Sequence, residues 1–203
     1  YVTPLFEPLA KAGFAWFSID YRLTPRVRNQ EQLDDLREAI EYMQRYAKSF
    51  RVDPNRIAIL GESASGQMVA QVATEKPAGV AAVVSFYGVY DFNAMVQEYS
   101  PRSIPARLFR LNRLNDYSRQ VMLRFSPIHN VRADMPPLLL IHGTNERLYS
   151  QGVAMAKRLE EARANYDFIK IENAPHGMEN WEGHAEWLGY KTKLVEWLKA
   201  KLR

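Results

Sequence analysis

The chain of 203 residues contains no cysteine, which excludes disulfide bonds and a catalytic thiolate. Because cytoplasmic and secreted proteins can both lack cysteine, the compartment stays open. The chain also has no apolar run of the roughly 18 to 20 residues that a membrane-spanning helix needs, and its first residues do not resemble a signal peptide. With 47% hydrophobic and 25% charged residues, the composition is typical of a soluble globular protein, and we expect one domain over residues 1–203.

Acidic residues are scarce in one part of the chain. Residues 100–133 contain one acid, Asp116, against seven arginines: Arg102, Arg107, Arg110, Arg113, Arg119, Arg124 and Arg132. We interpret this segment as a solvated basic face, and attraction of an anionic substrate or polymer is the alternative. No helix-turn-helix, zinc-finger or aromatic RNA-binding signature accompanies the arginines, so no nucleic-acid partner is predicted.

Five short runs rich in β-branched and aromatic residues predict strands, at residues 14–21, 56–60, 80–88, 137–143 and 166–174. Continuous apolar runs of this kind are typical of strands that are covered on both faces. Apolar residues at spacings of three and four predict a helix around residues 33–47, and further helices are expected from about Ser63, over 151–163 and over 184–201. The alternation of strands and helices predicts an α/β fold, with a mostly parallel sheet and helices on both faces.

Residues 91–135 interrupt this alternation between the third and fourth predicted strands. Helical fragments are expected near 103–114 and 117–125. Excursions outside the carboxyl ends of parallel strands commonly carry functional sites in such folds. We therefore interpret residues 91–135 as a lid-like or cap-like insertion.

Ser63 lies between a predicted strand and a predicted helix in the sequence ILGESASGQ. Small residues follow it, and a sharp strand-to-helix turn that exposes a nucleophilic serine needs small neighbours. The N-terminus of the following helix would supply backbone N–H groups to an oxyanion. In the alternative reading, Ser63 or Ser65 only caps the helix.

A nucleophilic serine needs a base and an acid that orients the base. Of the four histidines, His176 alone follows a predicted strand in a loop bounded by Pro and Gly, whereas His142 ends a strand and is expected to be structural. Glu146 follows the fourth predicted strand and is the candidate acid, with Asp91, after the third strand, as the rival. A surface salt bridge would explain either carboxylate without catalysis. The order Ser63, Glu146, His176 is the order of the triad in α/β-hydrolases.

At these residues the sequence resembles the α/β-hydrolase superfamily. Within it, the likeness is to the esterase and lipase group related to hormone-sensitive lipase, acetyl esterases and bacterial feruloyl or acetylxylan esterases. Four segments carry the resemblance: IDYRLTP (19–25), the nucleophile region DPNRIAILGESASG (53–66), PPLLLIHGTNERL (136–148) and the histidine loop APHGM (174–178). Together they cover nearly the whole chain.

The resemblance implies Ser63 as nucleophile, Glu146 as acid, His176 as base and the N–H of Ala64 in the oxyanion hole. The chain departs from the family pattern at Ser65, which replaces the last glycine of GxSxG, and at Glu146, where aspartate is more common. It also lacks the HGGG-type loop that gives relatives their other oxyanion donors. With the leading strands absent as well and Tyr1 in place of Met, we expect a truncated or processed form of the fold.

The resemblance implies a serine carboxylic-ester hydrolase that acts on short-chain acyl or aryl esters, including acetylated or feruloylated carbohydrate. It implies no metal or organic cofactor. Two alternatives stay open: a serine peptidase like prolyl oligopeptidase, and a catalytically silent binding protein that keeps the fold. The sequence also leaves the oligomeric state open, a homo-oligomer included.

Overall fold

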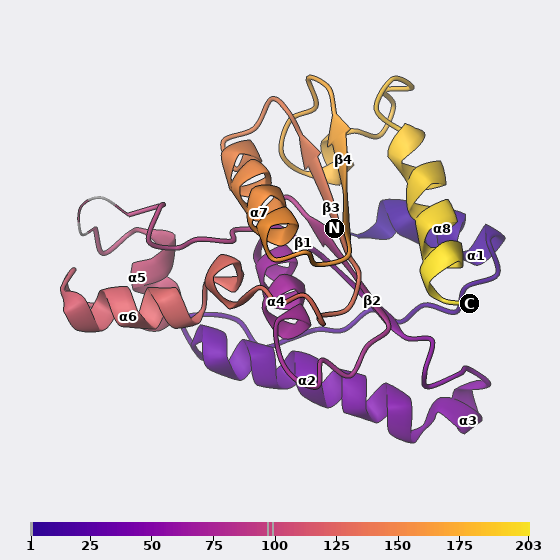
Figure 1. Ribbon diagram of the computed structural model, residues 1–203, viewed down its shortest axis with the longest axis horizontal. Helices are drawn as coiled ribbons and strands as arrows, with labels where there is room; N and C mark the ends of the chain where they lie inside the picture. The colour runs from indigo at the N-terminus through magenta and orange to yellow at the C-terminus, as the bar shows by residue number, and fades with distance from the viewer. Residues whose placement is uncertain (1, 97, 99) are drawn as a thin grey trace.

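The computed structural model describes residues 2–96, 98 and 100–203, and its centre is a four-stranded sheet (Figure 1). The strands are β1 (Ala58–Glu62), β2 (Ala82–Phe86), β3 (Leu138–Gly143) and β4 (Tyr166–Ile171), in that order across the sheet and all parallel. Four of the five predicted strands are therefore confirmed. Every residue of β2 and β3 is buried, as their uninterrupted apolar runs predict.

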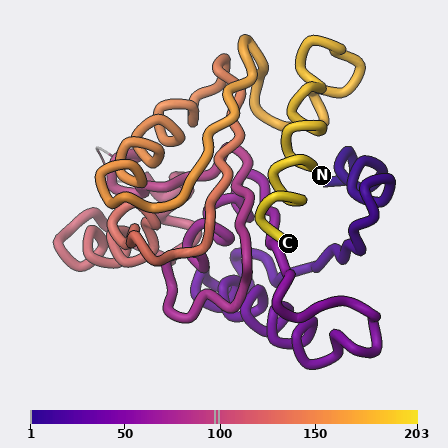
Figure 2. Tube along the Cα trace, turned by 45° about the vertical axis from the view of Figure 1, so that its right-hand side comes forward, coloured from indigo at the N-terminus to yellow at the C-terminus, as the bar shows by residue number. Residues whose placement is uncertain are grey.

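Helices cover both faces of the sheet (Figures 1 and 2). On one face lie α2 (Asn29–Arg45), α4 (Ser63–Ala73) and α7 (Tyr149–Glu161). On the other lie α1 (Phe6–Lys11) and α8 (Gly189–Lys201), which contact each other. Parallel strands need such crossover helices, because each chain segment must return to the same end of the sheet.

The two faces of the sheet form two separate apolar cores. The first packs apolar residues of α2, α4 and α7, such as Leu33, Met68 and Leu159, against the strands. The second packs Leu194 and Leu198 of α8 with other apolar side chains against the opposite face. The expected helix over 184–201 begins later, at Gly189, since residues 181–188 form successive turns and Gly183 has a φ of 85°.

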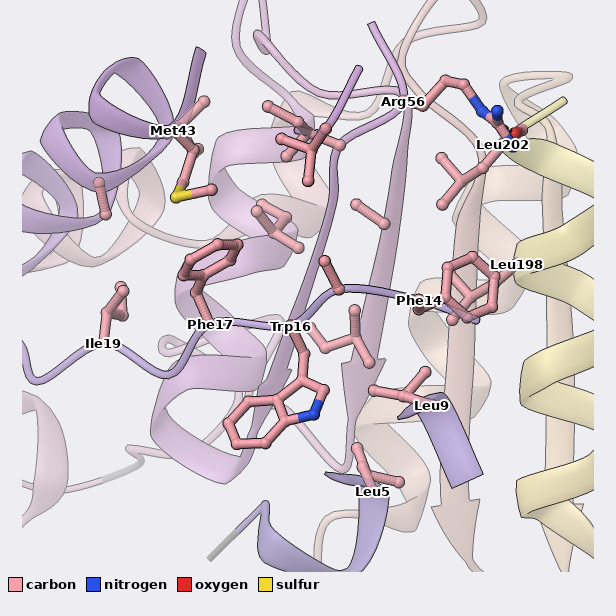
Figure 3. A pocket seen from close by; sticks show the side chains of 18 of the residues that line it. Leu5, Leu9, Phe14, Trp16, Phe17, Ile19, Met43, Arg56, Leu198 and Leu202 are labelled. Atoms are coloured by element: carbon pink, nitrogen blue, oxygen red, sulfur yellow. Dashed lines mark hydrogen bonds between the residues drawn. The ribbon is translucent and has the colours of Figure 1, made fainter. Parts of the chain in front are cut away.

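The prediction of a strand at residues 14–21 is wrong. In the described part of the chain, the backbone of residues 15–20 makes no hydrogen bond, and a strand exists only through pairing. The segment runs across the direction of the neighbouring strands, and an apolar cavity of about 420 Å³ lies between it, β1, α2 and α8 (Figure 3). This cavity is lined in part by Phe14, Trp16, Phe17 and Ile19. The apolar run at residues 14–21 therefore forms a cavity wall and not a strand.

Residues 91–135 form a small helical unit beside α4. The two expected helical fragments are confirmed as α5 (Ile104–Phe109) and α6 (Asp116–Arg124), and the short 3₁₀ helix η2 (Pro127–Asn130) follows. A third apolar cluster, which includes Phe92, Phe109 and Met122, holds the unit together. Six of the seven arginines of residues 100–133 are exposed; Arg132 is half-buried and donates to backbone carbonyls at the end of α4.

The remaining elements are short. They are the 3₁₀ helices η1 (Thr3–Leu5) and η3 (Met178–Asn180), and the helix α3 (Ala47–Phe50). Among the described residues, every helix is too short or too polar to cross a lipid bilayer.

Candidate active site

Ser63 occupies a strained turn between β1 and α4. Its φ is 50°, in the left-handed region that a residue with a Cβ seldom adopts. Glycines at two positions allow the turn: a Cβ on Gly61 would lie 2.3 Å from the carbonyl oxygen of Ser65, and a Cβ on Gly66 would lie 2.6 Å from that of Phe86. The tight packing of strand and helix thus holds the serine at the carboxyl edge of the sheet.

Ser65, the residue that departs from the family pattern, braces this turn. Its hydroxyl accepts a hydrogen bond from the backbone N–H of Glu62 at 3.0 Å and lies 2.9 Å from the Glu62 carbonyl oxygen, to which it donates. The N-cap of α4 is Glu62 and Ser65 is the third residue of its capping box, so neither serine is the N-cap that the alternative reading assigned. The Ser63 hydroxyl is left for another partner.

That partner is His176, on the loop after β4. Its Nε2 lies 3.1 Å from Ser63 Oγ, and its side chain is 38% exposed, so the ring reaches both the serine and the solvent. Two bonds fix the loop: Asn180 donates to the carbonyl oxygen of His176 at 2.8 Å, and the Trp181 indole donates to that of Pro175 at 2.8 Å. Gly177, with a φ of 96°, allows the chain to turn away directly after the histidine.

Glu146 follows β3 and lies next to His176 Nδ1, the ring nitrogen that faces away from Ser63. Its Oε2 accepts from His176 Nδ1 at 2.8 Å and from the backbone N–H of Leu148 at 3.1 Å, and its Oε1 lies 2.9 Å from His142 Nδ1. The side chain is only 1% exposed. Burial opposes its ionisation, but the hydrogen bonds from His142 and His176 outweigh burial and lower the pKa of Glu146 to about 2. The carboxylate is therefore ionised at neutral pH.

Asp91, the rival acid, is not brought to His176. Its Oδ1 accepts from the backbone N–H groups of Asn93 at 2.9 Å and Ala94 at 3.1 Å, which closes a local turn. Its Oδ2 lies 3.6 Å from His129 Nε2. The structure thus places this carboxylate at the start of the helical unit formed by residues 91–135.

Ala64 lies in the first turn of α4, directly after the serine. Backbone N–H groups in the first turn of a helix have no intrahelical acceptor, and the helix dipole places partial positive charge there. The N–H of Ala64 is therefore available to a negatively charged oxygen that forms next to Ser63 Oγ. Within the described residues, no group of three or more His, Asp or Glu side chains is arranged to hold a metal ion.

Two buried residues near these side chains were not predicted to belong to the site. Tyr87, with a φ of 37°, donates its hydroxyl to Glu62 at 2.5 Å and accepts from the backbone N–H of Met178 at 2.8 Å, and so ties the serine turn to the histidine loop. Burial first, and then the Glu62 carboxylate, raise the pKa of Tyr87, so its hydroxyl stays protonated. The second is His142, whose position after an apolar run gave no signal beyond a structural role.

Comparison with known proteins gives consistent matches. A family model described as BD-FAE matches residues 1–159, which is more than half of the chain. The probable carboxylic ester hydrolase LipM of Mycobacterium tuberculosis (strain ATCC 25618 / H37Rv) is 30% identical over 158 residues, and the match covers 71% of this chain and 37% of LipM. Esterase LipC of the same organism is 31% identical over 199 residues, with 86% of this chain and 48% of LipC covered.

A solved structure described as a truncated form of a carbohydrate esterase from gut microbiota superposes with a TM-score of 0.84. It is 24% identical, and the match covers 97% of this chain and 77% of that chain. A likeness at this identity shows a shared fold. The chain spans less than half the length of LipM and of LipC.

Proposed function

Because this chain belongs to the BD-FAE family and has the fold of the α/β-hydrolase esterases, we propose that it hydrolyses carboxylic esters through Ser63, His176 and Glu146. One observation carries the proposal. The three side chains are joined in series: Ser63 Oγ lies 3.1 Å from His176 Nε2, and His176 Nδ1 lies 2.8 Å from Glu146 Oε2. A serine hydroxyl becomes an effective nucleophile when a base and an orienting acid are within this reach.

The proposed reaction begins when Ser63 Oγ attacks the ester carbonyl carbon and His176 Nε2 takes the hydroxyl proton. Glu146 accepts from Nδ1 and stabilises the imidazolium that results. The N–H of Ala64 donates to the oxyanion of the tetrahedral intermediate. Collapse of the intermediate breaks the bond to the alcohol oxygen, which takes the proton from His176 as it leaves. Water, activated by the neutral His176, then hydrolyses the acyl-enzyme.

The oxyanion site sets the expected rate. The family resemblance implies further donors from an HGGG-type loop, and this sequence contains no such motif. Removal of a single oxyanion donor costs roughly 10²- to 10³-fold in rate. We therefore expect turnover by these 203 residues to be slow, with acylation of Ser63 by a reactive reagent as the more sensitive measure.

For the substrate we propose short-chain acyl or aryl esters, with acetylated or feruloylated carbohydrate as the natural class. The likeness to a carbohydrate esterase supports this choice. The helical unit at 91–135 follows β2 in the chain and so begins near the carboxyl edge of the sheet, where Ser63 lies, and we propose that it acts as a cap over the acyl group.

A fluorophosphonate probe tests the proposal on the chain as it stands. We expect one adduct, located at Ser63 by peptide mass spectrometry, and none in Ser63→Ala. We also expect the wild type to hydrolyse p-nitrophenyl acetate. The His176→Ala variant should lose this activity but still unfold cooperatively, which shows that it is folded. Full recovery of unlabelled wild-type protein would instead support a catalytically silent binding protein.

A further inference from the structure

His142 lies on the opposite side of the Glu146 carboxylate from His176. Its Nδ1 is 2.9 Å from Oε1, and His176 Nδ1 is 2.8 Å from Oε2, so each carboxylate oxygen faces one imidazole. The side chain of His142 is 0% exposed and that of Glu146 is 1% exposed. The proposed reaction uses His176 and Glu146 but assigns nothing to His142.

The protonation of His142 follows from its neighbour. Glu146 has a pKa of about 2, so its ionised oxygens can only accept hydrogen bonds, and His142 Nδ1 must carry a proton. Burial lowers the pKa of His142, although the charge of Glu146 opposes this, so the ring is neutral. A neutral ring with Nδ1–H leaves Nε2 without a proton, and the Tyr90 hydroxyl oxygen lies 3.3 Å from that atom.

The far side of His142 faces a buried polar chain. Tyr90 is fully buried, and its hydroxyl oxygen lies 2.7 Å from Ser85 Oγ. The Ser85 hydroxyl donates to the carbonyl oxygen of Gly66 at 2.8 Å. Gly66 belongs to α4, the helix that begins at Ser63. Since the Ser85 proton goes to Gly66, the single Tyr90 proton goes to Ser85, and the 3.3 Å separation of Tyr90 from His142 Nε2 is a packing contact.

Packing fixes the plane of the same ring. Gly152, in the first turn of α7, lies against it, and a Cβ there would be 2.7 Å from both Cδ2 and Nε2. On another side the ring of Phe168 meets the imidazole nearly at a right angle, with centroids 5.7 Å apart. A ring enclosed in this way cannot turn its Nδ1–H away from Glu146 without moving α7 or β4.

We propose that His142 is a positioning residue for the triad. As a neutral imidazole that donates Nδ1–H to Oε1 of Glu146, it directs Oε2 toward His176 and keeps the buried carboxylate ionised. Glutamate has one more rotatable bond than aspartate, so a carboxylate on this longer side chain loses more conformational freedom when it is fixed. A second rigid donor supplies that constraint. The inference rests on the proposed function, because Ser63, His176 and Glu146 are the groups that it positions.

The competing explanation is that His142 only satisfies a buried polar cluster. In that case its loss lowers stability but leaves the remaining groups of the site in place. Three variants separate the two explanations. His142→Leu removes the donor at similar volume, and His142→Asn keeps a side-chain N–H near the position of Nδ1. His184→Leu is the control, because His184 has a comparable contact with a glutamate, 3.5 Å to Glu186, but lies on the surface.

Two measurements are made on the full chain and on each folded variant. The first is the low-field proton NMR signal of His176 Nδ1–H, which reports its bond to Glu146 without any turnover. The second is the rate constant for fluorophosphonate labelling of Ser63. In His142→Leu we expect the signal to shift or vanish and labelling to slow by about 10- to 100-fold, as for loss of a hydrogen bond to a charged group. His142→Asn should recover most of both, and His184→Leu should match the wild type.

Wild-type values of both measurements in a folded His142→Leu variant would overturn the proposal. Equal losses in the leucine and asparagine variants would also overturn it, because ring packing and not the N–H would then be responsible. Absence of labelling in the wild type would contradict the proposed function. The NMR signal of His176 would then still test whether His142 positions Glu146. If the leucine variant does not fold, ¹⁵N NMR of labelled histidines decides: we expect the Nδ1–H tautomer for His142, and an Nε2–H tautomer or an imidazolium contradicts it.

Discussion

Single atoms decide whether the turn at Ser63 can form. Gly66 packs so closely on β2 that an added Cβ would lie 2.6 Å from the carbonyl oxygen of Phe86, which cannot move without disturbing the sheet. We expect Gly66→Ala to lower the free energy of unfolding by about 2 to 4 kcal/mol, as for overpacking that forces a backbone shift. Urea titration measures this. Gly189→Ala is the control, because a Cβ there meets nothing within 4 Å, and its stability should equal or slightly exceed that of the wild type.

Two buried groups make stability depend on pH. The pKa of His142 is lowered from 6.5 by burial, and the pKa of Glu146 is lowered from 4.5 to about 2 by its two histidine partners. In both cases the unfolded chain binds a proton that the folded chain does not. Their contributions are therefore fully present above about pH 6.5 and are lost as the pH falls, first through His142 and then, below about pH 4.5, through Glu146.

We accordingly expect the free energy of unfolding to fall steadily from about pH 7 to pH 4. Urea titrations at four or more pH values measure it. His142→Asn cannot titrate in this range and should flatten the upper part of the decline, whereas Glu146→Gln should flatten the lower part. A wild-type free energy that is constant between about pH 7 and pH 5 would contradict the assignment of a neutral, buried His142.

The sequence predicts the residues of the candidate site better than the residues that support them. Ser63, Glu146 and His176 could be found because each follows a predicted strand, and the carboxyl ends of parallel strands meet at one edge. Tyr87 and His142 also follow or end strands, but an aromatic or histidine within an apolar run looks like ordinary core. Their roles depend on hydrogen bonds to residues 25 and 4 positions away, which only the folded chain reveals.

At the scale of elements, the question is which strand supplies the acid. Glu146, after β3, contacts His176, whereas Asp91, after β2, closes a local turn at the start of the helical unit 91–135. We expect Glu146→Gln to slow ester hydrolysis by orders of magnitude, up to about 10⁴-fold, because the amide no longer stabilises the imidazolium. Asp91→Asn should change the rate severalfold at most. Steady-state kinetics with p-nitrophenyl acetate decides, and the reverse ranking would place the acid on β2.

The elements themselves were predictable where local pattern and tertiary contacts agree. The apolar runs of β1 to β4 are buried between two helical layers, so composition and environment point to the same structure. Residues 14–21 have an equally apolar run, yet they pair with no strand in the part of the chain that the structure describes, because the segment crosses the strand direction on the other side of a cavity (Figure 3). Apolarity predicts burial, but hydrogen-bond pairing also depends on which neighbour lies alongside.

At the scale of the whole molecule, that cavity leaves apolar side chains exposed beside the sheet. Trp16, Phe17 and Ile19 are 42%, 49% and 40% exposed, and all three line the same apolar space of about 420 Å³ beside β1, which is an edge strand of the described sheet. Contiguous exposed apolar surface next to an edge strand promotes binding of hydrophobic molecules and self-association.

We therefore expect the chain to bind the dye anilinonaphthalene sulfonate while natively folded, and to self-associate as its concentration rises. Phe17→Ser should reduce both effects, because it removes apolar surface from the cavity wall without touching a hydrogen bond. Tyr117→Ser is the matched control: Tyr117 is 71% exposed but lies outside this cavity, so its loss should change neither. Dye fluorescence and size-exclusion chromatography over a concentration series measure the two effects. Equal behaviour of the two variants would show that scattered surface aromatics, and not the cavity beside β1, govern how the molecule associates.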